Sequence, residues 1–114
     1  MENCIFCRII ERRAPGKILY EEEGVVAIAD AHPQAPVHIL VLPRKHLTSL
    51  KEAGPEDEPL LGRPLAVAAR VARERGLEAS GYRAIVNTGP GAGQSVFHLH
   101  VHVLGGRVMH WPPG

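Results

Sequence analysis

The sequence predicts an α+β fold with five strand-like segments and two helices. Residues 98–104 alternate histidine with aliphatic residues, and this period of two is typical of a strand. Residues 60–75 repeat apolar side chains at intervals of three and four, as in a helix that packs on one face. The apolar run over residues 37–43 predicts a central strand.

The composition favours one soluble domain spanning residues 1–114, because a chain of 114 residues can bury one hydrophobic core. A net charge of +1 gives no sign of a nucleic-acid-binding surface. No apolar run approaches the ~20 residues that cross a bilayer, and the N-terminus lacks the pattern of a secretion signal. We therefore expect a cytoplasmic protein that binds neither nucleic acid nor a membrane.

The first predicted element is a short helix over residues 4–11, with Asn3 as its N-cap. A spacing of three places Cys4 and Cys7 on one helical face. Such a pair can bind a metal, carry out redox chemistry or remain as two reduced thiols. The chain has two cysteines in total, so a zinc site would need histidines to complete it.

Two strands over residues 17–22 and 25–30 follow, with a tight turn between them, and the central strand comes next. His38 lies in that central strand. It is either an ordinary core histidine or a residue that supports the histidines at 98–102.

The long helix over residues 60–75 contains Pro64, which removes a helical hydrogen bond. The helix therefore begins near Arg63, with Pro64 in its first turn, or it begins near Glu56 and kinks. Gly76 is the predicted end signal.

A strand over residues 81–87 leads into a glycine-rich loop over residues 88–95. Glycine lets backbone N–H groups approach an anion, although most loops of this kind are simple turns. This loop joins the strand directly to the histidine segment.

The alternation places His98, His100 and His102 on one face of the last strand and aliphatic side chains on the other. Neutral imidazoles can attack an electrophile, bind a metal or transfer a proton. The alternative is a half-buried strand whose polar positions happen to be histidine.

The pattern His-φ-His-φ-His-φ-φ over residues 98–104, with φ apolar, resembles the signature of the histidine triad (HIT) superfamily. Gly-Gln-Ser-Val at 93–96 and the Trp-Pro-Pro-Gly ending at 111–114 resemble its histidine triad nucleotide-binding (HINT) branch, the nucleoside phosphoramidases. The resemblance extends from Cys4 to Gly114. It implies a five-stranded, mainly antiparallel sheet with two helices, and a homodimer that joins two such sheets.

The resemblance also implies a metal site and a set of catalytic residues. The ligands of a structural zinc ion would be Cys4, Cys7, His46 and His98, although the site could also be unoccupied or partly occupied. No catalytic metal or organic cofactor is expected. The catalytic set would be His98, His100, His102 and Ser95, with His100 as the nucleophile that forms a nucleotidyl-imidazole, His102 on a phosphate oxygen and Ser95 protonating the leaving amine.

The nucleotide site implied by the resemblance has three parts. Asn87 and the amides of Gly93, Gln94 and Ser95 would hold the phosphate together with His100 and His102. Asp30 would bind the ribose, and Phe6, Ile9 and Ile28 would lie near the base. Trp111 would reach the site of the partner copy. Many members have an aromatic residue at the position of Ile28, so the base preference is expected to be looser.

The implied function is hydrolysis of the P–N bond of purine nucleoside 5′-phosphoramidates, such as AMP–amine or AMP–lysine conjugates. The alternatives are a dinucleoside polyphosphate hydrolase or nucleotidyl transferase, a nucleotide-binding adaptor with little catalysis, and a zinc-organised structural module.

Overall fold

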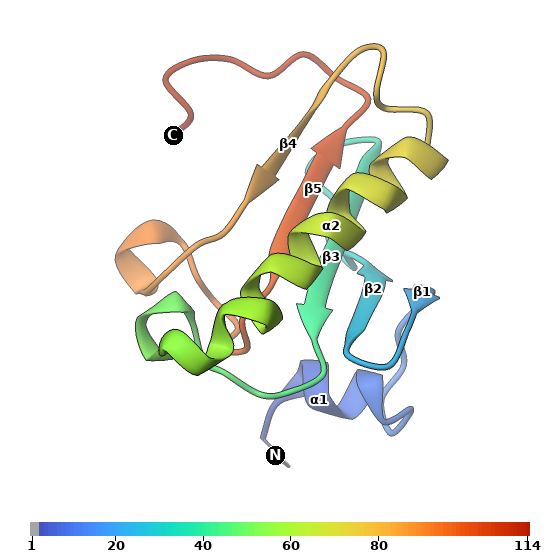
Figure 1. Cartoon of the computed structure of the whole chain (residues 1–114). Helices are drawn as coiled ribbons and strands as arrows, with labels where there is room; N and C mark the ends of the chain where they lie inside the picture. Colours follow the sequence, from blue (N-terminus) through green and yellow to red (C-terminus); the bar gives the residue numbers. More distant parts are fainter. Residues whose placement is uncertain (1–2) are drawn as a thin grey trace.

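The structure is a computed structural model that describes residues 3–114 (Figure 1). Over that range the chain forms two α-helices and five strands, in this order: α1 (Ile5–Ile10), β1 (Ile18–Glu21), β2 (Val25–Ala29), β3 (Val37–Pro43), α2 (Glu58–Glu74), β4 (Tyr82–Ile85) and β5 (Val101–Gly105). Single 3₁₀ turns cover Leu50–Glu52, Pro55–Asp57 and Pro90–Ala92. Each predicted helix and strand is present, and only the ends differ.

The five strands form one sheet in the order β1-β2-β3-β5-β4, and every neighbouring pair is antiparallel. The predicted α+β fold is therefore confirmed, with β3 in the middle of the sheet. The register of β3 on β5 pairs Leu40 with His102 and His38 with Leu104. Paired residues on neighbouring strands point to the same face of the sheet, so Leu40 and His102 share one face.

The two faces of the sheet are covered by different helices, as Figure 1 shows for α2. The face under α2 is a core of small aliphatic residues from the helix and the strands: Val25, Ala27, Ile39, Val41, Val67, Ala68, Val71, Ala72, Leu77, Val101 and Val103. The face under α1 holds Cys4, Phe6, Cys7, Ile9, Ile10, Val26, Ile28, Leu40 and Leu42. Strands β2 and β3 are thus buried on both faces, which explains their nearly continuous apolar sequence.

The N-cap of α1 is Cys4, and the prediction of Asn3 is wrong. Cys4 has extended backbone angles, and its Sγ accepts the N–H of Cys7 at 3.3 Å. The sulfur therefore occupies the place of a capping oxygen, and the helix begins one residue later than a cap at Asn3 would allow.

Helix α2 begins at Glu58, so Pro64 lies inside it and the predicted start near Arg63 is wrong. A 3₁₀ turn precedes the helix, and there Asp57 accepts the N–H of Gly54 at 3.0 Å and pairs with Lys45. Pro64 is fully buried, and its burial offsets part of the cost of the missing hydrogen bond. Within residues 3–114, no helix is long and apolar enough to cross a bilayer.

Candidate functional site

The three histidines lie on the α1 side of the sheet, but only His102 belongs to β5. The segment before the strand leaves the sheet, because the N–H of Leu99 donates to the carbonyl of Leu47 at 2.6 Å. The predicted strand over 98–104 is therefore wrong in its first half, since β5 begins at Val101. The rings of His100 and His102 remain neighbours, with centroids 4.9 Å apart.

His100 is buried with a defined proton on one nitrogen. Its Nδ1 lies 2.6 Å from the main-chain carbonyl oxygen of His98. A carbonyl only accepts, so Nδ1 carries the hydrogen and Nε2 keeps a free lone pair. Burial lowers the pKa of His100, and the ring of Phe6 meets it edge-on at 5.1 Å. A neutral imidazole with a free Nε2 can act as a nucleophile or a base.

His102 contacts His38, which is itself oriented by the main chain. Nδ1 of His38 accepts the N–H of Gln34 at 2.9 Å, so Nε2 of His38 carries the hydrogen. That Nε2 lies 2.9 Å from Nδ1 of His102. When Nε2 of His38 donates its hydrogen to Nδ1 of His102, the neutral ring of His102 must carry its own hydrogen on Nε2. Burial, together with His100 and His38, lowers the pKa of His102 to about 4, so the ring is neutral at neutral pH.

Asp30, directly after β2, lies beside His38. Its Oδ1 accepts the N–H of His32 at 2.7 Å, and its Oδ2 lies 3.2 Å from Nε2 of His38. The ligand atoms of Asp30, His38 and His102 lie within 4.8 Å of one another, close enough for a metal. However, the Gln34 contact places a hydrogen on Nε2 of His38, and a nitrogen that carries a hydrogen has no lone pair to offer a metal.

A second cluster brings together Cys4 and Cys7 from α1, His46 from the corner after β3, and His98. Nδ1 of His98 lies 3.4 Å from each sulfur and 3.2 Å from Nδ1 of His46. The sulfur of Cys7 lies 3.4 Å from Nδ1 of His46. Nε2 of His98 donates to the carbonyl of Pro43 at 2.8 Å, which leaves the lone pair of Nδ1 directed into the cluster.

These spacings fit one tetrahedral zinc ion. Bonds of about 2.3 Å to sulfur and about 2.0–2.1 Å to nitrogen give edges of about 3.5 Å between sulfur and nitrogen and about 3.4 Å between two nitrogens. Burial and the neighbouring Cys4 raise the pKa of Cys7 to about 11, and burial lowers the pKa of His98 to about 4. Metal binding here must therefore displace thiol protons, while the His98 ring is already neutral.

The side chain of Gln94 is buried and shapes the glycine-rich loop. It accepts the N–H of Gly89 at 2.8 Å and donates to the carbonyls of Thr48 and Val96. The N–H groups of Gly93 and Gln94 donate to main-chain carbonyls at Pro90 and Gly89. Two of the three amides that were expected to hold a phosphate are thus bonded inside the loop.

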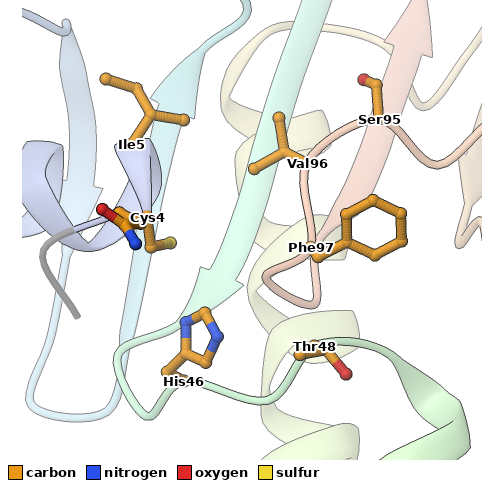
Figure 2. A pocket seen from close by; sticks show the side chains of 8 residues that line it. Cys4, Ile5, His46, Thr48, Ser95, Val96 and Phe97 are labelled. Carbon is orange, nitrogen blue, oxygen red and sulfur yellow. The ribbon is translucent and has the colours of Figure 1, made fainter.

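A pocket of about 500 Å³ lies beside the cysteine–histidine cluster (Figure 2). It is lined by Asn3, Cys4, Ile5, His46, Thr48, Ser95, Val96 and Phe97. Ser95 is exposed at this pocket, and the sticks of Figure 2 place Cys4 and His46 on the side facing Val96 and Phe97.

The remaining predicted residues lie in different surroundings. Phe6, Ile9 and Ile28 are buried in the α1-side core, and Phe6 packs edge-on against the rings of both His98 and His100. Asn87 follows β4 and is half-buried. Trp111 is 82% exposed in the C-terminal segment.

Sequence reasoning left the role of His38 open and missed two main-chain groups, the carbonyl of Pro43 and the N–H of Gln34. The sequence of β3 contained the signal for His38. His38, Leu40 and Leu42 occupy every second position of the strand, so their side chains point to the face that packs against α1.

The profile of the HIT domain family matches residues 11–109. The chain belongs to the HIT family. An uncharacterized HIT-like protein of Synechococcus elongatus is 49% identical over 113 residues, which cover 99% of this chain and 98% of that protein.

Solved structures agree with this membership. A HIT family hydrolase from Legionella pneumophila is 41% identical with a TM-score of 0.95, covering 98% of this chain and 100% of its own. A Zn-bound histidine triad family protein from Mycobacterium smegmatis is 35% identical with a TM-score of 0.82, covering 93% of this chain and 76% of its own.

Proposed function

We propose that this HIT protein hydrolyses the P–N bond of purine nucleoside 5′-phosphoramidates through a covalent nucleotide on His100. The observation that carries the proposal is the 2.6 Å contact between Nδ1 of His100 and the carbonyl of His98. It leaves Nε2 of a buried, neutral ring as the nucleophile. Membership of the HIT family and the similarity to a protein named a HIT family hydrolase support it.

The reaction proceeds in two displacements at phosphorus. Nε2 of His100 forms a bond to the α-phosphorus while the P–N bond breaks, and the amine leaves with a proton donated by Ser95. Water then attacks the same phosphorus and gives one proton to Ser95, which restores the serine hydroxyl. The P–N bond to His100 breaks and releases the nucleoside monophosphate. The hydrogen on Nε2 of His102 stabilises the phosphoryl oxygens as their charge grows.

The remaining predicted residues bind the nucleotide and complete the site. Asp30 takes the ribose hydroxyls, and Asn87 with the backbone N–H of Ser95 takes the phosphate. Phe6, Ile9 and Ile28 border the base. We further propose one cytoplasmic HIT domain over residues 1–114 that works as a homodimer, in which the exposed Trp111 of each copy reaches the site of the other.

We also propose that Cys4, Cys7, His46 and His98 hold a structural zinc ion. The donor set fits a tetrahedral ion, and a similar HIT family structure is described as Zn-bound. When bound, zinc would fix the ring of His98 and tie α1 to the segment before β5. It would take no part in the reaction, because all four of its positions are filled by the chain.

The test of the function is turnover of a fluorogenic adenosine phosphoramidate, compared between the wild type and His100→Ala. We expect turnover in the wild type and its loss in the variant, while both bind AMP. Leu65→Ala is the matched control, because Leu65 is 52% exposed on α2 and lies on the opposite face of the sheet. Equal turnover in His100→Ala would overturn the proposal.

Two other outcomes point to the competing functions. Faster turnover of diadenosine polyphosphate than of phosphoramidate would favour a polyphosphate hydrolase or transferase. Tight AMP binding by a wild type that turns over no substrate would favour a nucleotide-binding adaptor.

The zinc proposal is tested by metal analysis of the purified chain. We expect about one zinc per chain in the wild type and in Leu65→Ala, and a clear loss in Cys7→Ser. Full zinc content in Cys7→Ser would exclude this ligand set.

A further inference from the structure

We infer that Cys4 and Cys7 form a reversible oxidation site, in which a peroxide converts the two thiols into a disulfide. Both cysteines are free, and their sulfur atoms belong to a cluster whose ligand atoms lie within 4.8 Å of one another. Cys4 is the N-cap of α1, and its sulfur accepts the N–H of Cys7 at 3.3 Å. The two residues thus form a C-x-x-C pair at a helix start, the arrangement used by dithiol–disulfide proteins.

The two cysteines differ in their position relative to the pocket. Cys4 and His46 contribute to the lining of the 500 Å³ pocket beside the cluster (Figure 2). Cys7 is as buried as Cys4, at 8% exposure, but it is not among the residues that line the pocket. A small oxidant that enters the pocket therefore meets Cys4 first, and Cys7 is placed to react with the product.

The chemistry balances with hydrogen peroxide as the oxidant. The Cys4 thiol gives up its proton and attacks one peroxide oxygen, the O–O bond breaks, and the leaving hydroxide takes that proton to become water. This step gives a sulfenic acid on Cys4. The Cys7 thiol then attacks that sulfur and gives up its proton, the S–O bond breaks as the S–S bond forms, and the leaving hydroxide takes that proton and departs as a second water. Two thiols and one peroxide thus give one disulfide and two waters.

Oxidation removes the thiolates that a zinc ion needs, because the sulfurs of a disulfide carry no charge. His46 and His98 alone cannot hold the ion, so zinc is released. His98 also orients the nucleophile, since its carbonyl accepts the hydrogen of His100 Nδ1. Without the zinc ion, the ring of His98 is held less firmly, and turnover falls. This last consequence rests on the proposed function, whereas disulfide formation does not.

The experiment treats the zinc-loaded full chain with hydrogen peroxide and follows three quantities over time. These are the intact mass, the zinc captured by a coloured chelator, and phosphoramidate turnover. We expect the chain to lose two hydrogens, release its zinc in step, and lose turnover in proportion. Excess dithiothreitol with added zinc should restore all three. Peptide mapping should find the disulfide between Cys4 and Cys7.

Cys7→Ser identifies the order of the two steps. Without the second thiol, oxidation should stop at a sulfenic acid on Cys4, which dimedone traps. Because this variant also lacks a zinc ligand, peptide mapping of the wild type serves as the measurement that does not depend on its folding.

Two results would overturn the inference: oxidation to sulfinic acid with no disulfide, and a disulfide only between two chains. Disulfide formation and zinc loss with unchanged turnover would overturn the link to His100. Absence of turnover before oxidation would count against the proposed function alone, because mass and zinc release still report on the thiols.

Discussion

The main-chain carbonyl of His98 lies 2.6 Å from Nδ1 of His100, and the ring of the same His98 lies in the cysteine–histidine cluster. One residue therefore joins two sites through different groups. Its ring takes part in the cluster, and its carbonyl fixes the tautomer of the nucleophile. Any change at the cluster that moves His98 reaches His100 directly.

This contact predicts which nitrogen of His100 carries the nucleotide. Since Nδ1 donates to a carbonyl, the adduct should form on Nε2. The wild type is mixed with adenosine phosphoramidate and quenched within one turnover, and the adduct is mapped by mass spectrometry and by nitrogen–phosphorus coupling in NMR. An adduct on Nδ1, or on His102, would contradict the proposed orientation.

His38 is expected to act as a positioning residue for His102. His38→Ala removes the donor 2.9 Å from Nδ1 of His102 and allows the wrong tautomer, so kcat should fall about tenfold or more with little change in KM. His38→Gln can donate from its amide and should recover part of kcat. A purely structural role would instead lower the unfolding temperature of both variants equally.

The matched control for His38 is Gln34→Ala. Gln34 contacts His38 through its backbone N–H, which the substitution keeps. Gln34→Ala should therefore leave kcat within about twofold of the wild type. A large loss in this variant would mean that the Gln34 side chain, and not the orientation of His38, controls the rate.

The buried histidines predict a loss of stability in mild acid. Burial lowers the pKa of His38 and lowers that of His102 from 6.5 to about 4. Well above pH 6.5 these histidines are neutral in both the folded and the unfolded chain. Below it the unfolded chain takes up protons first, so the free energy of unfolding falls until the folded pKa is reached. For His102 this amounts to about 2 kcal/mol by pH 5.

Urea denaturation at pH 7 and pH 5, with chelator present, measures this decline. Most carboxylates are still charged at pH 5, so the histidines dominate the window. His102→Gln should show a decline that is smaller by about 2 kcal/mol. A variant whose decline equals that of the wild type would show that His102 is not buried as a neutral ring.

The sequence predicted the fold well where local periodicity decides the structure. The period of two placed His100 and His102 on the face opposite Val101 and Val103, and the helical period identified α2. These patterns repeat over several residues, so one unusual position does not hide them.

The errors arose where a distant residue decides the structure. Leu99 leaves the sheet to bond Leu47, and the N-cap of α1 is a cysteine, which capping preferences do not favour. The orientation of His38 depends on a main-chain N–H at Gln34, and main-chain groups leave no mark on residue type. The predicted roles at the candidate site, including the zinc site, therefore came from resemblance and not from periodicity.

Gly62, inside α2, and Gly76, just after α2, should respond to substitution by alanine in opposite ways. Gly62 lies inside the helix, and an added Cβ would meet nothing within 4 Å. Alanine loses less backbone entropy than glycine when the chain folds into a helix. Gly62→Ala should therefore stabilise the chain by about 0.5–1 kcal/mol.

Gly76 also has open space around an added Cβ, but its φ is +74°. It follows the helix in the left-handed conformation, while the N–H of Leu77 bonds the carbonyl of Ala72. Gly76→Ala should therefore destabilise the chain by about 1 kcal/mol through backbone strain alone. Because neither substitution creates a clash, the opposite signs in urea denaturation isolate backbone conformation as the cause. Destabilisation of similar size in both variants would contradict this account.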